Sequence, residues 1–220
     1  MYHCNCLRRV LVDAAASQEW SCGLDAAMAA AVAVAPATSG ARIRSVAAQL
    51  GVRQHVFGLS SPEIAAILAE AGLQVSLRSG SSWLSALWRN TGWRGVEHFC
   101  GNNPSVAAIT AIRRLARMGA DLCFDKSATW SDVVNALTSG TAAIVCVSAE
   151  AYYRISEQWN HYVVIVVRDD EIRVIDHLAV IGDRWYPEWR RYTSNARSYD
   201  WKTWRGDLLI VTSEKRSNRV

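Results

Sequence analysis

The sequence predicts an α+β fold in which helices dominate up to residue 137 and strands follow. Alanine-rich and proline-capped stretches in the first part of the chain have strong helix propensity. Short apolar runs after residue 140 have the length and the β-branched content of strands. At 220 residues, with half of them apolar, the chain can bury a sizeable core, and no Pro/Ser-rich linker divides it. We therefore expect a single domain spanning residues 1–220.

The expected helices cover residues 21–34, 43–50, 61–72, 83–89, 104–118 and 130–137. Ser21 can serve as the N-cap of the first helix, and Pro36 stops it. The third helix has the best-defined start, because Ser61-Pro62-Glu63 combines an N-cap, a proline at the first helical position and an acid in the first turn. Cys22 therefore falls in the first turn of the first helix.

The expected strands cover residues 73–78, 142–147, 162–167, 172–175 and 208–212. The run Ala142–Val147 is apolar throughout, as expected of a central strand that is buried on both faces. Cys146 within it is predicted to be a small buried core residue. The polar segment Arg168–Glu171 predicts a tight hairpin between the two strands that flank it.

Three residues have the pattern of a thiol-nucleophile triad. Cys22 opens a helix, and His161 and Asp176 lie at the outer ends of the two hairpin strands. A hairpin loop of two residues would point His161 and Asp176 to the same face of the sheet, whereas a loop of three would separate them. The helix dipole and an imidazolium on His161 both favour a thiolate at Cys22. We predict Cys22 as the nucleophile, His161 as the proton shuttle and Asp176 as the acid that orients His161.

Neighbouring residues receive supporting roles. The side chain of Gln18 is expected to hold the oxyanion together with the backbone N–H of the nucleophile. Trp20 and Asn160 are expected to line the substrate site. His177 also adjoins the acid, but adjacent strand residues point to opposite faces, so only one histidine can join the site and His161 is the better placed.

These residues carry a resemblance to the papain-like superfamily of cysteine peptidases. They are Gln18 before Cys22-Gly23 at a helix start, a helix–glycine–strand unit over residues 133–147, His161, Asp176 and a terminal Trp204-x-Gly206-x-Leu208-Leu209-Ile210-Val211. The chain is most similar to the branch of double-glycine leader peptidases and guanylyl-cyclase-domain-like proteins. The resemblance implies a helical half and an antiparallel-sheet half with the active site in the cleft between them. It also implies cleavage of a peptide bond, often after a small residue of a leader peptide.

Two features depart from that family. Gln18 leaves only three residues before Cys22, fewer than the oxyanion glutamine of the family leaves. The sequence Cys22-Gly23-Leu24-Asp25 also differs from the motif of papain itself, which excludes close kinship to papain.

The predicted function is cysteine-dependent cleavage of a peptide or isopeptide bond through a thioester, with a peptide or protein as the partner and no metal or cofactor. Cys4 and Cys6 flank a single Asn, a spacing that does not fit a zinc knuckle. Two alternatives stay open. Resolution of the thioester by an amine would make the chain an acyltransferase or a peptide-ligating enzyme, and loss of the reaction would leave a binding protein on the same fold.

The net charge of +4 is spread along the chain, although basic and aromatic residues alternate over residues 184–192. We interpret that segment as rings that cover the sheet while the arginines reach water, so no nucleic-acid partner is expected. The longest apolar run, Ala26–Ala37, is shorter than the roughly 20 residues that span a bilayer. The sequence thus predicts no membrane partner and a cytoplasmic protein, or an effector exported by a non-classical route. Its Ala, Arg and Trp content is typical of a GC-rich bacterial genome.

Overall fold

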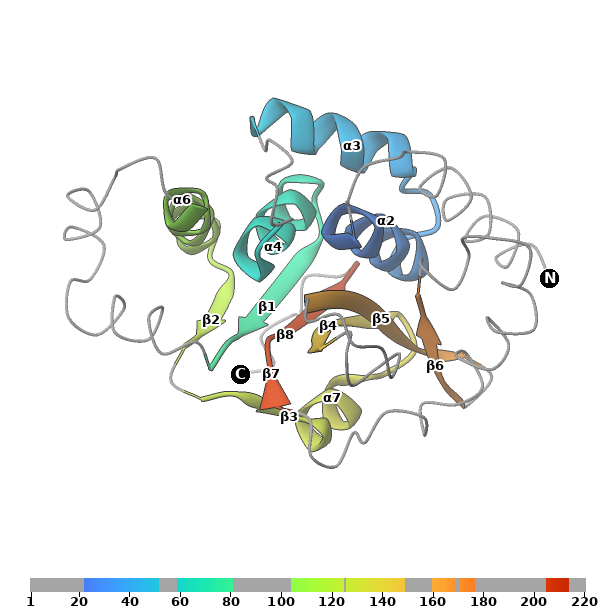
Figure 1. Cartoon of the computed structure of the whole chain (residues 1–220). Coiled ribbons are helices and arrows are strands. Elements are labelled where there is room, and N and C mark those ends of the chain that lie inside the picture. The colour runs from blue at the N-terminus through green and yellow to red at the C-terminus, as the bar shows by residue number, and fades with distance from the viewer. Residues whose placement is uncertain are drawn as a thin grey trace, which may run out of the picture.

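The computed structural model describes residues 22–51, 59–80, 104–124, 126–148, 160–168, 171–176 and 205–213. Within these segments, helices pack against a mixed β-sheet, so the fold is α+β as predicted (Figure 1). Helices α2, α3 and α4 lie on one side of the sheet, and α7 lies on the other (Figure 1). The predicted helix over residues 83–89 falls outside the described residues.

The helices are α2 (Cys22–Val34), α3 (Gly40–Gln49), α4 (Ser61–Glu70), α6 (Pro104–Arg117) and α7 (Trp130–Ala136). The strands are β1 (Gln74–Arg78), β2 (Asp121–Cys123), β3 (Ala128–Thr129), β4 (Thr141–Ser148), β5 (Asn160–Arg168), β6 (Glu171–Ile175), β7 (Arg205–Gly206) and β8 (Leu208–Thr212). All five predicted strands are confirmed to within two residues at each end. The sequence prediction missed β2, β3 and β7, which are too short to show a periodic pattern.

The larger sheet has six strands in the order β2-β1-β8-β4-β5-β6, and β3 pairs with β7 in a separate two-stranded sheet. Every pair in the larger sheet is antiparallel except β1 with β2, which is parallel. A parallel pair needs a crossover connection, and α6 lies between β1 and β2 in the chain. The expectation of a purely antiparallel sheet was therefore wrong at the β2 edge.

Helix α2 forms the centre of the helical layer. Ten of its 13 residues are buried, which is the pattern of a helix enclosed on all sides. Five of these ten residues are alanines, whose small side chains let the helix approach β4 and β5 closely. Helix α3 packs on the outside of α2 and α4. The sequence of α2 thus places its first residue, Cys22, at the end of a tightly held helix.

Two helix starts differ from the prediction by a few residues. Helix α3 begins at Gly40 rather than Ile43, because the hydroxyl of Ser39 accepts a hydrogen bond from the backbone N–H of Arg42 at 3.2 Å. The N-cap of α4 is Ser60 rather than Ser61, since the carboxylate of Glu63 accepts a bond from the Ser60 backbone N–H at 2.8 Å. Ser61 is therefore the first residue of α4, and its hydroxyl is left for other contacts.

No helix in the described part of the chain is long and apolar enough to cross a membrane.

Candidate active site

The register of the β5–β6 hairpin decides where His161 and Asp176 lie. Arg168 pairs with Glu171, so two residues separate the strands, as required for both side chains to share a face. The Nε2 atom of His161 lies 2.9 Å from Oδ1 of Asp176. Both side chains are fully buried. The two residues, 15 positions apart in sequence, thus form a buried hydrogen-bonded pair.

The environment of His161 favours its charged form. Burial lowers the pKa of this imidazole, but the hydrogen bond with Asp176 and the contact with Cys22 outweigh burial and raise the pKa to about 9. Below that pH the ring is an imidazolium held between a carboxylate and a thiol. This is the charge state that a thiolate partner needs.

Cys22 occupies the first position of α2 and is partly exposed. Its thiol lies close enough to His161, on strand β5 against which α2 packs, to raise the pKa of that imidazole. The positive end of the α2 dipole also favours negative charge at this position. The structure therefore brings together Cys22, His161 and Asp176, of which Cys22 is partly exposed and the other two are buried.

The remaining predicted site residues are not all placed. Gln18, Trp20 and His177 fall outside the described residues, as does the basic and aromatic segment over residues 184–192. Asn160 is the first residue of β5, and its backbone pairs with Ser148 of β4. It directly precedes His161 in the chain.

Gly23 sets the close approach of α2 to α4. A Cβ atom at this position would lie 2.9 Å from Cβ of Leu59 and 3.0 Å from Cδ1 of Ile64. Because Leu59 Cβ is fixed to the backbone, the clash could be relieved only by moving the start of α2 or of α4. A glycine directly after Cys22 is therefore required by packing.

We expect the Gly23→Ala substitution to destabilise the protein. Overpacking of this kind costs about 1–3 kcal/mol, and the better helix propensity of alanine offsets up to about 1 kcal/mol of that loss. Urea unfolding followed by circular dichroism measures the difference. A free energy of unfolding equal to or above that of the wild type would mean that α2 does not approach α4 this closely.

A second polar cluster adjoins the site, and the sequence analysis did not single it out. It consists of Ser61, Ser79, Cys146, Tyr162 and Asp207, which come from or adjoin α4, β1, β4, β5 and β8. Cys146 was predicted to be a core residue, but it is partly exposed and its thiol contacts the hydroxyl of Tyr162. Nothing in the sequence marks Asp207, because an acidic residue before an apolar strand is ordinary.

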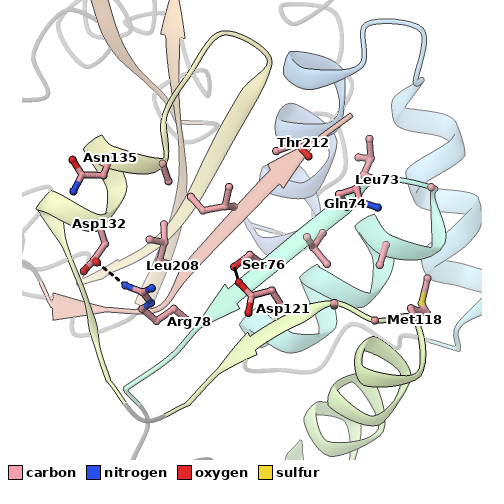
Figure 2. A pocket seen from close by; sticks show the side chains of 17 residues that line it. Leu73, Gln74, Ser76, Arg78, Met118, Asp121, Asp132, Asn135, Leu208 and Thr212 are labelled. Carbon is pink, nitrogen blue, oxygen red and sulfur yellow. Dashed lines mark hydrogen bonds and ion pairs between the residues drawn. The ribbon is translucent and has the colours of Figure 1, made fainter. Parts of the chain in front are cut away.

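A cavity lined by described residues lies elsewhere, over β1, β2 and β8 beside α7 (Figure 2). Its volume is about 540 Å³, and an Arg78–Asp132 ion pair of 2.6 Å and a Ser76–Asp121 hydrogen bond of 2.9 Å lie in its wall (Figure 2). None of the triad residues lines it. This cavity is therefore separate from the cysteine site.

No group of three or more His, Cys, Asp or Glu side chains in the described segments is arranged to hold a metal ion. Comparisons with protein-family models, curated proteins and solved structures gave no match for this chain.

Proposed function

We propose that the protein is a cysteine peptidase with a papain-like fold, whose catalytic residues are Cys22, His161 and Asp176. The observation that carries the proposal is the position of His161, which contacts the thiol of Cys22 and lies 2.9 Å from Asp176. A partly exposed thiol, a raised imidazole pKa and a buried orienting carboxylate are the three properties that thiol-dependent amide cleavage requires.

The two ring nitrogens of His161 have different roles. Nε2 faces Asp176, so its proton is donated to that carboxylate. Nδ1 is then the nitrogen that serves the thiol of Cys22. Asp176 fixes the orientation of the ring and stabilises its positive charge, as the third member of a triad does.

The reaction has two steps, formation of the thioester and its hydrolysis. The sulfur of Cys22 attacks the carbonyl carbon, the C–N bond breaks, and the imidazolium of His161 gives its proton to the leaving amine. Water then attacks the thioester and gives a proton to the neutral ring, the C–S bond breaks, and the carboxylic product leaves. The second step regenerates the thiolate–imidazolium pair.

The oxyanion of each tetrahedral intermediate needs hydrogen-bond donors. The first N–H groups of a helix have no acceptor within the helix, so the backbone N–H of Cys22 is a suitable first donor. Gln18 is the proposed second donor. The site thus combines a cysteine at a helix start with a histidine and an acid on a sheet, and this combination supports assignment to the leader-peptidase branch of the papain-like superfamily.

A digest of a peptide library, analysed by mass spectrometry, tests the proposed function. We expect new termini with the wild type and none with Cys22→Ala, while Cys123→Ala retains cleavage because Cys123 lies on β2, away from the triad. A parallel digest with an added primary amine separates hydrolysis from acyl transfer, since only transfer gives products that contain the amine. Absence of both kinds of product for the wild type would contradict the proposal.

A further inference from the structure

Ser61, the first residue of α4, joins parts of the chain that are far apart in sequence. Its hydroxyl donates to Oδ2 of Asp207 at 2.7 Å and lies 3.1 Å from the hydroxyl of Tyr162. The other oxygen of the Asp207 carboxylate accepts a bond from the Ser79 hydroxyl at 2.6 Å. Ser61 and Ser79 are both buried, so this carboxylate is the acceptor on which both hydroxyls depend.

The direction of every bond in this cluster follows from the charge of Asp207. Ser61 has a single hydroxyl proton and gives it to Asp207, so Tyr162 must donate to Ser61. The side chain of Cys146 lies beside Tyr162. The result is a one-way chain of donors from Tyr162 through Ser61 to Asp207.

Cys146 and Tyr162, two members of the cluster, stay protonated near neutral pH. Burial, with the charges of Asp207 and Cys22, raises the pKa of the Cys146 thiol to about 12. Burial and the neighbouring Cys146 raise the pKa of Tyr162 well above its usual value. The hydrogen-bond directions therefore hold across the neutral pH range, and the chain is a fixed structural unit.

This chain contacts both halves of the candidate active site. Tyr162 directly follows His161 in β5, and adjacent strand residues point to opposite faces, so Tyr162 anchors the strand from the face that His161 does not use. Gly23 directly follows Cys22, and α4 packs against it through Ile64. The start of α4 is thus bonded to the strand that carries the base and packed on the helix that carries the nucleophile.

We propose that Ser61, Tyr162 and Asp207 are positioning residues that set the distance between Cys22 and His161. The inference rests on the proposed cysteine-peptidase function and extends it to residues outside the triad. Misplacement of catalytic groups by about 1 Å can cost on the order of 100-fold in rate. Loss of a single hydroxyl from the chain is therefore expected to alter the reactivity of Cys22.

The test measures the pH dependence of Cys22 alkylation by iodoacetamide in Tyr162→Phe and Ser61→Ala. Tyr162→Phe removes one oxygen and keeps the ring, so the packing of β5 is retained. We expect the alkylation rate near neutral pH to fall by about tenfold or more, and the midpoint of the profile to move toward that of a free thiol, about 8.5. Ser61→Thr keeps the hydroxyl and is expected to restore the wild-type profile.

Ser76→Ala is the matched control. It removes a serine hydroxyl whose bond to Asp121 is 2.9 Å long, in the same sheet but away from the site. We expect its alkylation profile to equal that of the wild type. Near-ultraviolet circular dichroism and the melting temperature of each variant establish that it is folded, and Tyr162→Phe decides the question if Ser61→Ala does not fold.

The outcomes separate the two proposals. A wild type whose Cys22 reacts faster than Cys123, with an unchanged profile in Tyr162→Phe, overturns the positioning role and leaves the peptidase proposal standing. A lower melting temperature with an unchanged profile has the same meaning, because it shows a structural role alone. A wild-type Cys22 that reacts no faster than Cys123, with no effect of His161→Gln, overturns the peptidase proposal and the positioning role with it.

Discussion

Alkylation of Cys22 by iodoacetamide is expected to be fast at about pH 6, where an unassisted thiol is almost entirely protonated. The pKa of His161 is raised to about 9, so the imidazole is charged at that pH and can pair with a thiolate. Replacement by His161→Gln keeps a side chain of similar size without the charge. We expect it to lower the rate at about pH 6 by 10- to 100-fold.

Cys123 is the internal control for this measurement. It is a partly exposed cysteine of the same chain and lies on β2, at the opposite edge of the sheet from the β5–β6 hairpin. Peptide mapping after alkylation gives the rate at each cysteine separately. Equal rates at Cys22 and Cys123, unchanged by His161→Gln, would show that no thiolate–imidazolium pair exists and would favour a binding protein on this fold.

The second large expected effect is a loss of stability when the buried carboxylate of Asp176 is removed. Asp176→Ala leaves His161 fully buried without its carboxylate, and loss of one partner from a buried pair costs about 3–5 kcal/mol. Urea unfolding at about pH 7 measures this loss. Glu171→Gln is the matched control, because it removes the charge of Glu171 from its 2.9 Å pair with Arg173 on the same hairpin, where Glu171 is exposed and Arg173 is partly exposed. We expect less than about 1 kcal/mol there.

The His161–Asp176 pair makes the free energy of unfolding depend on pH between about 6.5 and 9. The folded pKa of His161, about 9, lies above the unfolded value of 6.5, so its stabilisation is complete below pH 6.5 and is lost as the pH rises through about 9. The shift corresponds to about 3 kcal/mol. Asp176→Ala is expected to flatten this fall between pH 6.5 and 9. A wild-type free energy of unfolding that stays constant across the window would contradict the charged pair.

Cys146 adds a separate loss of stability at higher pH. Its thiol has a pKa of about 12 in the fold and 9.0 when unfolded, so the unfolded chain releases a proton that the folded chain retains. Stability from this group is present below pH 9 and falls above it. Cys146→Ala removes this contribution, which lets the His161 window be measured alone.

The sequence by itself determined most of the elements and identified His161 and Asp176 as candidate partners. Apolar runs of strand length predicted β4, β5, β6 and β8, because the apolar pattern of a strand depends only on neighbouring residues in the sequence. The polar segment between β5 and β6 predicted the hairpin, but the structure decided the length of its loop and therefore which side chains share a face. The helical start at Cys22 followed from the alanine-rich segment in the same local way.

Only the tertiary structure decided which distant groups meet. Ser61 and Asp207 are 146 positions apart, and their hydrogen bond depends on where α4 and β8 pack rather than on either local sequence. The parallel pairing of β1 with β2 follows from the crossover through α6, and the three residues of β2 carry no periodic pattern. Gly23 reads as an ordinary helix residue until Leu59 and Ile64 lie against it. Local preferences act over a few residues, whereas these contacts arise when the apolar faces of separate elements are buried together.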